Sequence, residues 1–381
     1  MSDPHVKNPP LDILGLTSEE LQAAAKFVLP VGHGISTALY PRVMREGIFA
    51  PQAFPVSAST VSAWNMYFSC RLLEVIQHHA EETTSGITAK AVFRTHDGYE
   101  VEAVRIPMHL TADGHMEHTI CVSSQVGCKM GCTFCETGRM GLLRNLTAGE
   151  IVAQVVTARA VLGWEPKNIV FMGMGEALDN VDNVIQALHV LTDRRGLHYS
   201  QERITVCTSG HAVGIARLAE LGWKRLNLSI SLNGGTDEVR SRIMPVNRKT
   251  PLAELQRILS AYPQRRNFTL GVNYCLLPGL NDTREDATHV ARFCVPLGRV
   301  LVNLIPYNPG NLPLTRAPRE DEIDTFIEWL RDDGLPVRRR ITKGRTIMAA
   351  CGQLGNVELR KNGVAPSQRK DHDESTPALE P

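Results

Sequence analysis

The sequence lacks the features that mark membrane and exported proteins. No apolar run reaches the roughly 18 residues that a membrane-spanning helix needs. The N-terminal region also lacks the charged and apolar segments of a signal peptide. We therefore expect a cytoplasmic protein with no membrane association. The net charge is only +1, which excludes the global basic field of many nucleic-acid binders, so any RNA contact must come from local patches.

A disulfide framework is also missing, although cysteine is not. The nine cysteines are odd in number and unevenly spaced. In a chain of this length with no export signal, such a pattern favours reduced thiols, metal ligation or catalysis.

What is present is a long alternation of apolar strand and helix patterns. The expected strands are 118–124, 168–174, 203–208, 225–232, 268–277 and 299–306. The expected helices are 147–163, 180–195, 212–222, 251–262, 283–296 and 319–334, before a short strand at 337–342. Repeated βα units imply parallel strands with right-handed crossovers. Six units are too few for an eight-fold barrel, so a partial barrel or a doubly wound α/β sheet remains, with its chemistry at the C-terminal strand ends.

The flanking regions differ from this α/β core. A capping box from Thr17 to Glu20 starts an amphipathic helix over 17–29, and a second helix is expected over 61–83. Segment 89–107 alternates like a hairpin with a turn at Asp97-Gly98. We divide the chain into an N-terminal accessory domain (1–90), a β connector (91–117), a core (118–355) and a C-terminal tail (356–381), the last expected to be disordered from about 363.

Three cysteines lie close together in the segment GCKMGCTFCETG. Cys128, Cys132 and Cys135 have the spacing Cx3CxxC, which suits a loop around a metal centre. Closed structural sites use four ligands, whereas three leave a coordination position open for chemistry. The alternative is a structural zinc site completed by a distant Cys or His, but zinc sites normally use paired CxxC arms.

This spacing, with Phe134 before the third cysteine, resembles the radical S-adenosylmethionine (radical SAM) superfamily. Five motifs over roughly 100–355 resemble, in consistent order, the RlmN/Cfr family of radical SAM adenine methyltransferases. They are CVSSQVGC (121–128), GLLRNLTAGEIV (141–152), MGMGEAL (172–178), PYNP (306–309) and AACGQL (349–354). The resemblance implies a partial (β/α)6 radical SAM barrel with a small N-terminal helical accessory domain.

The resemblance also implies a reaction. One 4Fe-4S cluster per chain, on Cys128, Cys132 and Cys135, would bind S-adenosyl-L-methionine at its open iron. One S-adenosylmethionine would methylate Cys351 to S-methylcysteine, and a second would give the 5′-deoxyadenosyl radical that activates this methyl group. After addition to an adenine ring carbon, Cys121 would resolve the protein–RNA crosslink and leave a Cys121–Cys351 disulfide for external thiols to reset.

Further roles follow from the same resemblance. Glu102 matches a proton acceptor, although a Glu in an alternating segment is often a solvated strand residue. The alternative interpretation of Cys121 and Cys351 is that both are buried thiols with a structural role. The positions that match contacts to S-adenosylmethionine are Gly175, Glu176, Cys207, Ser231, Leu232, Asn233 and Asn308. Two of them depart from the family pattern, because Cys207 replaces serine and Asn233 replaces histidine.

The expected substrate is rRNA, with tRNA as a second candidate, and an external donor such as a flavodoxin or ferredoxin would supply the electron. Ala177 resembles the branch of the family that methylates adenine C8, whereas VSSQVGC resembles the branch that methylates C2. We take methylation at C2 as the first hypothesis. A basic run favours an RNA rim but also suits a solvated strand edge: Arg338, Arg339, Arg340, Lys343 and Arg345. We expect a monomer. The competing hypotheses are a non-catalytic iron–sulfur or zinc protein that binds RNA, and a radical SAM enzyme with a non-RNA substrate.

Overall fold

The computed structural model describes residues 9–355, so the tail expected at 356–381 lies outside the described residues. A ten-stranded sheet forms the centre, in the order β14-β13-β12-β11-β10-β9-β6-β5-β4-β3. Its parallel strands are β6 (Met116–Cys121), β9 (Asn168–Phe171), β10 (Ile204–Thr208), β11 (Asn227–Ser231), β12 (Leu270–Leu276), β13 (Val300–Pro306) and β14 (Val337–Arg339). The strands β3 (Glu74–Thr83), β4 (Gly86–Arg94) and β5 (Glu100–Leu110) extend the sheet in antiparallel fashion from β6.

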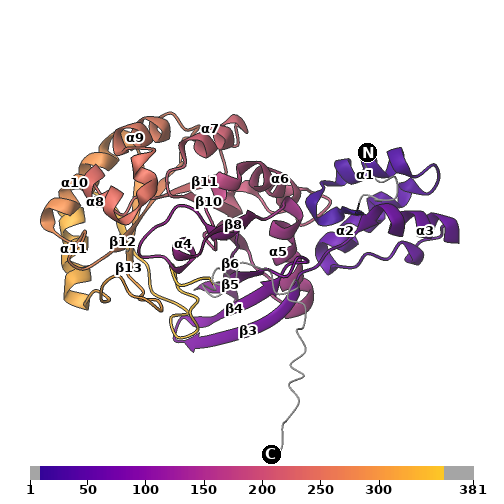
Figure 1. Cartoon of the computed structure of the whole chain (residues 1–381), viewed down its shortest axis with the longest axis horizontal. Coiled ribbons are helices and arrows are strands. Elements are labelled where there is room, and N and C mark those ends of the chain that lie inside the picture. Colours follow the sequence, from indigo (N-terminus) through magenta and orange to yellow (C-terminus); the bar gives the residue numbers. More distant parts are fainter. Residues whose placement is uncertain (1–8, 356–381) are drawn as a thin grey trace, which may run out of the picture.

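Helices follow the parallel strands and lie around the curved sheet, which gives the partial barrel (Figure 1). They are α5 (Ala148–Leu162), α6 (Val181–Thr192), α7 (Ala212–Glu220), α8 (Asp237–Ile243), α9 (Leu252–Ser260), α10 (Arg284–Cys294) and α11 (Glu320–Asp332). The six core strands and the helices expected between them are confirmed, and so is the capping box of Thr147 and Glu150 at the start of α5. Helix α8 is an addition, because its seven residues are too short to give a clear helical period.

The helix expected over 61–83 is wrong in its second half. Helix α3 (Ala58–Tyr67) ends early, and residues 74–83 form the edge strand β3, which is mostly exposed. Its pairing with β4, rather than its own apolar pattern, makes it a strand. The hairpin turn expected at Asp97-Gly98 is confirmed between β4 and β5.

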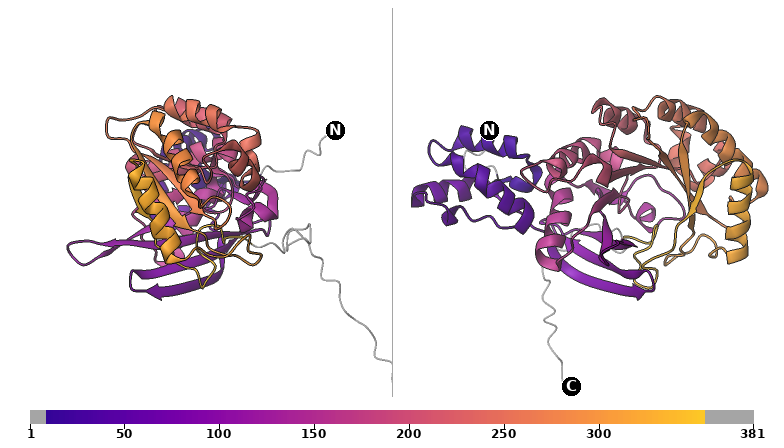
Figure 2. Two further views of the ribbon diagram at one scale, coloured as in Figure 1. Left: turned by 90° about the vertical axis from the view of Figure 1, so that its left-hand side faces the viewer. Right: turned by 180° about the vertical axis from the view of Figure 1, so that it is seen from behind.

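The N-terminal helices form a lobe beside α5 and α6, seen in both Figure 1 and the rear view of Figure 2. The lobe contains α1 (Ser18–Val28), α2 (Ser36–Glu46) and α3. One hydrophobic core continues from this lobe into the barrel. Two hydrogen bonds also join them, from Ser18 N to Asp193 (2.6 Å) and from Arg45 Nε to the Gly196 carbonyl (3.0 Å). Residue 90 lies inside β4, and the division of the chain into domains there stays a prediction.

Residues 340–355 cross from the β13 side of the sheet to the antiparallel strands. Arg340 N donates to the Leu304 carbonyl on β13 (2.8 Å), and Lys343 donates to the Pro107 carbonyl on β5. Farther along, Gly355 N donates to Glu102, also on β5 (3.1 Å). This crossing segment, yellow in Figure 1, carries Cys351. Within residues 9–355, no helix has the length and apolar character needed to span a bilayer.

Candidate active site

The three clustered cysteines lie on a compact β-hairpin and the short helix inside it. Cys128 ends β7 (Gln125–Cys128), which pairs with β8 (Gly141–Asn145), and Cys135 is the N-cap of α4 (Glu136–Met140). Gly127 has φ 77°, and a Cβ there would come within 1.9 Å of the Gly141 carbonyl oxygen. Only glycine allows the two strands to approach this closely beside the first cysteine.

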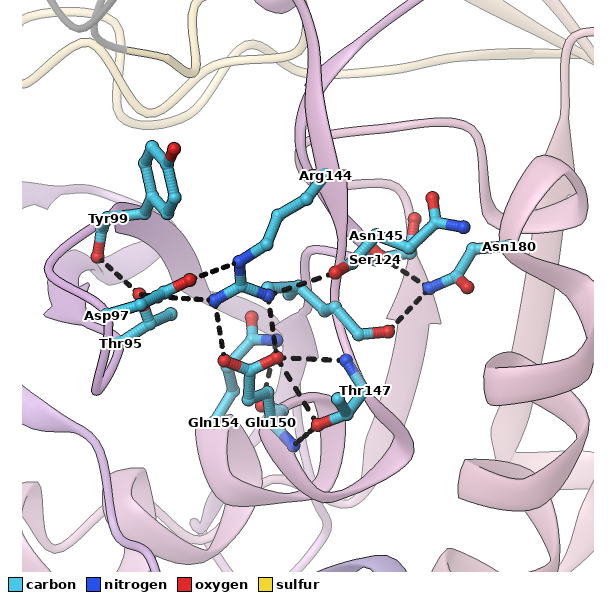
Figure 3. A network of polar contacts seen from close by, with 11 residues as sticks. Thr95, Asp97, Tyr99, Ser124, Arg144, Asn145, Thr147, Glu150, Gln154 and Asn180 are labelled. Carbon is cyan, nitrogen blue, oxygen red and sulfur yellow. Dashed lines mark hydrogen bonds and ion pairs between the residues drawn. The ribbon is translucent and has the colours of Figure 1, made fainter. Parts of the chain in front are cut away.

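An Arg144 network fixes this hairpin to the surrounding sheet and helix (Figure 3). Arg144, on β8, forms two hydrogen bonds of 2.7 Å with Asp97 in the β4–β5 turn. It also binds Glu150 in the first turn of α5 at 2.7 and 2.9 Å. Bidentate pairs of this kind restrict orientation as well as distance, so they hold the cysteine hairpin in one position.

The cysteines line a cavity of about 190 Å³ at the C-terminal strand ends, which we call the cluster cavity. Five of the residues matched to S-adenosylmethionine contacts also line it: Gly175, Glu176, Cys207, Ser231 and Asn233. Among residues 9–355, no three His, Cys, Asp or Glu side chains converge on one point in the way a single metal ion requires.

The donor set of this cavity fits an iron–sulfur cluster. Burial, with the other thiols nearby, raises the pKa of Cys128 to about 12 and that of Cys132 well above its usual value. Burial also raises the pKa of Cys135. Three thiolates here therefore need a compensating positive charge, which bound iron supplies when thiols become ligands.

The opposite wall of the cluster cavity fits a polar ligand. Glu176 is buried, and its carboxylate accepts from Ser209 N (2.7 Å) and Leu178 N (3.1 Å). The Ser209 hydroxyl is buried and has no hydrogen-bond partner among the described residues. Gly175 has φ 98°, and a Cβ there would lie 2.6 Å from Gln125 Cβ. An unpaired buried hydroxyl beside a carboxylate suits the amino and carboxylate groups of S-adenosylmethionine.

The two positions that depart from the family pattern retain polar contacts. Cys207 Sγ lies 3.6 Å from Ser231 Oγ and accepts from Asn273 Nδ2 at 3.3 Å. Asn233 adopts φ 56°, which asparagine tolerates, and its side-chain oxygen accepts from Cys275 N (2.8 Å). Leu232, in contrast, is completely buried in the core and lines neither this cavity nor the next. Its side chain therefore supports the site from behind.

A second cavity of about 360 Å³ lies inside the barrel, and we call it the barrel cavity. It reaches from Asn308 and Cys121 down to Asn168 and Arg203, at the starts of β9 and β10. The two cavities share four residues in their walls: Met172, Asn273, Ile305 and Cys351. Cys351 is therefore open to the cluster cavity on one side and to the barrel cavity on the other.

Cys121 and Cys351 both line the barrel cavity, although they come from opposite ends of the core. Cys121 is buried at the end of β6, whereas Cys351 is exposed toward the cavities. Burial raises the pKa of Cys121, and the neighbouring Cys351 adds to this rise. Desolvation by the surrounding protein also raises the pKa of Cys351, whereas the positive charge of Arg340 opposes that rise. Both are free thiols in this structure, so a disulfide between them stays a prediction.

Glu102 lines neither cavity but holds the crossing segment near Cys351. It is buried on β5, and Lys90 Nζ lies 3.3 Å from its carboxylate. Lys90 also donates to the Met348 carbonyl (3.2 Å), and Gly355 N donates to Glu102 (3.1 Å). Desolvation raises the pKa of Glu102, and the Lys90 charge opposes this. Glu102 is therefore not a solvated strand residue, which was the alternative that its alternating segment suggested.

Replacing Lys90 with methionine is expected to lower the free energy of unfolding by about 3 kcal/mol, since it leaves the Glu102 charge buried and unpaired. The loss should shrink as pH falls. Because the folded-state pKa of Glu102 is already raised, protonation removes the unpaired charge first in the folded protein. Urea unfolding across a pH series measures both effects. The matched variant Lys90→Met/Glu102→Gln should recover part of the loss, and equal losses in the two variants would contradict the ion-pair account.

Several site residues were not expected from the sequence, namely Gln125, Ser209 and Asn273. Gln125 is fully buried and donates to Asn145 (2.8 Å) and Asp179 (2.9 Å) while accepting from Glu176 N (2.8 Å). Asn273 is a polar residue inside an otherwise apolar strand, and this was the available signal. Gln125 lies within the CVSSQVGC motif, which was recognised without assigning it a contact. Ser209 directly follows a predicted strand, where chemistry is expected in such folds.

The basic run before Cys351 divides in the structure. Arg340 and Lys343 line the barrel cavity. Arg339 instead pairs with Glu320 on α11 at 2.6 Å. Arg338 and Arg345 are exposed. The run therefore contributes Arg340 and Lys343 to the barrel cavity, and its interpretation as an RNA rim stays a prediction.

Comparison with known proteins first defines the class. The family model described as "Radical SAM superfamily" matches residues 122–294, which include the cysteine hairpin and most of the barrel. A solved structure, "Crystal Structure of a radical SAM methyltransferase from Sphaerobacter thermophilus", is 34% identical with a TM-score of 0.80 and covers 90% of this chain and 99% of that one. The fold and the site are those of a radical SAM enzyme, and this class carries a 4Fe-4S cluster and uses S-adenosylmethionine.

Two relatives narrow the assignment. "Probable dual-specificity RNA methyltransferase RlmN 1" of Protochlamydia amoebophila is 39% identical over 93% of this chain and 97% of its own length. "Dual-specificity RNA methyltransferase RlmN" of Syntrophotalea carbinolica is 41% identical over 78% of this chain and 77% of its own length. The chain belongs to the RlmN family of radical SAM RNA methyltransferases.

Proposed function

We propose that this RNA methyltransferase transfers a methyl group to C2 of an adenine through an S-methylcysteine at Cys351. The observation that carries the proposal is the position of Cys351 in the wall shared by the cluster cavity and the barrel cavity. A carrier thiol must meet the radical source on one side and the RNA base on the other. A direct methyl transfer from the cofactor to the base would not need a thiol between them.

Each cavity then has a role. The cluster cavity would hold one 4Fe-4S cluster on Cys128, Cys132 and Cys135, with S-adenosylmethionine against Gly175, Glu176, Cys207, Ser231 and Asn233. When bound, this pair supplies a carbon radical for hydrogen abstraction. The barrel cavity would hold the adenine beside Cys121 and Asn308, and its apolar walls would exclude water from the reaction. Leu232 would contribute through its backbone alone, because its side chain is in the core.

The protein's own groups would handle the protons and the thiol exchange. Cys351 would accept the methyl group. Cys121, on the same cavity, would attack the Cys351 sulfur, so that a Cys121–Cys351 disulfide forms while the bond between that sulfur and the RNA-bound carbon breaks and releases the methylated RNA; external thiols would then reduce the disulfide. Glu102 is proposed as the proton acceptor on the family resemblance alone, because its carboxylate lines neither cavity and contacts Lys90 and Gly355 N. Two S-adenosylmethionine molecules would be consumed per turnover, with the electron from a flavodoxin or ferredoxin. A cytoplasmic monomer remains our expectation.

The relatives' printed name, dual-specificity RNA methyltransferase, supports more than one RNA substrate. We propose rRNA first and tRNA second. The C8 alternative, favoured by Ala177, predicts a different product from the same site.

Nucleoside mass spectrometry of rRNA and tRNA from a deletion strain tests the substrate and the ring carbon. We expect 2-methyladenosine to disappear from rRNA, with or without tRNA, and to return when the wild-type protein is expressed. Loss of 8-methyladenosine instead would overturn the C2 assignment. Unchanged adenosines in both RNA classes would contradict the choice of RNA substrates.

A further inference from the structure

A basic cavity lies between the barrel cavity and the N-terminal helices. Its volume is about 390 Å³, and its lining comes from the end of α5, the segment before β9 and the loop between α6 and β10. Three cations, Arg159, Lys167 and Arg203, line it with a single carboxylate, Glu165. The cavity therefore has an excess of positive charge, although the whole protein is nearly neutral.

One residue connects this basic cavity to the site. Arg203 lines both the basic cavity and the barrel cavity. Its guanidinium is held between the two by Asn168 Oδ1 (3.2 Å) and by Glu117, 3.6 Å away. A ligand group in the basic cavity would thus be separated from the barrel cavity by the width of one side chain.

The other side of the basic cavity faces the N-terminal lobe. Leu197 and His198 line the cavity, and the preceding Gly196 carbonyl accepts the bond from Arg45 Nε on α2 (3.0 Å). Arg194 and Arg195, on the same loop, are exposed. Positive side chains therefore extend from the barrel cavity across the basic cavity toward α2.

Arg159 has an unused donor. Its Nε is buried and has no hydrogen-bond partner among the described residues. A buried guanidinium N–H without a partner is costly, and an anionic oxygen is the acceptor that best satisfies it. Lys167 lines the cavity as well; its side chain is exposed and adds a flexible positive charge.

We propose that the basic cavity binds a backbone phosphate of the RNA close to the target adenosine. The inference rests on the proposed function, which puts the target base in the barrel cavity. RNA bound there must pass an opening, and Arg203 connects the opening to a cavity whose charge and free donor suit phosphate. Contacts of this kind set affinity and register, while the barrel cavity selects the base. The N-terminal lobe would then meet the RNA beyond the phosphate.

The test is equilibrium binding of unmodified rRNA from the deletion strain over a potassium chloride series. Arg159→Gln/Lys167→Gln should weaken binding about tenfold and reduce the salt slope by about one per lost phosphate contact. Glu165→Gln should strengthen binding, because it removes the only carboxylate from the lining. The matched control is Lys249→Gln/Arg257→Gln, which removes one exposed charge on α9 and one just before it and should bind like the wild type. Helix α9 lies on the far side of the barrel from the N-terminal lobe (Figure 1).

Equal affinity and salt slope in the wild type and the Arg159/Lys167 variant would overturn the proposal. So would an equal loss in the control pair, which would indicate general charge attraction. Lys167→Gln alone guards against a folding defect, because the side chain is exposed; it should still lower the salt slope. Binding requires no chemistry, so failure of the methyl-carrier mechanism at Cys351 would leave these binding results unchanged.

Discussion

Replacing Cys351 with alanine is expected to lower the rate of RNA methylation by a factor on the order of 10⁴ or more, because the carrier nucleophile has no substitute. Cys121 cannot take over, since it lines the barrel cavity but not the cluster cavity where S-adenosylmethionine would bind. The iron content should stay normal. Methylation of rRNA from the deletion strain, followed with labelled S-adenosylmethionine, measures the effect.

Cys121→Ala is the informative partner of this variant. It keeps the carrier and removes the thiol proposed to release the product, so a covalent protein–RNA adduct should accumulate and survive a denaturing gel. Mass spectrometry of the adduct should locate the bond at Cys351. Substantial turnover by Cys351→Ala would overturn the carrier mechanism and favour direct transfer of the methyl group. If Cys121→Ala gave no adduct, the proposed role of Cys121 would be contradicted, but the carrier role of Cys351 would not.

Cys128→Ala is expected to remove the cluster and with it all activity. Two remaining thiols cannot hold a 4Fe-4S cluster that uses cysteine ligands, so the brown colour and the iron, about four per chain, should be lost. Both steps of the reaction should stop, because each depends on S-adenosylmethionine in the cluster cavity. Absorption spectra and iron analysis of anaerobically purified protein measure the loss.

The matched control for this variant is Cys294→Ala. Cys294 is buried in α10 and lines neither cavity, so its replacement removes a thiol without touching the site. It should stay brown and active. A colourless wild-type protein with stoichiometric zinc would contradict the cluster assignment and favour the structural-zinc alternative.

Much of the barrel could be predicted because its signals are local. Each strand of the core is a short apolar run, and each helix has an amphipathic period or a capping box such as Thr147 with Glu150. The cysteine hairpin is local as well: three ligands within eight residues can be recognised before any tertiary contact is known. Strand β3 could not be recognised, because it is an exposed edge strand whose pairing with β4 makes it a strand.

The sequence by itself determined the class of chemistry, since the ligand spacing and the strand order place a cluster at the carboxyl ends of parallel strands. Only the tertiary structure decided what the distant residues do. The crossing segment carries Cys351 from beyond β14 to the wall between two cavities, where it meets Cys121 of β6. The same folding put the Leu232 side chain in the core and joined Arg203 to a basic cavity. Such contacts depend on the closure of a curved sheet by a segment far along the chain, and no local pattern encodes that closure.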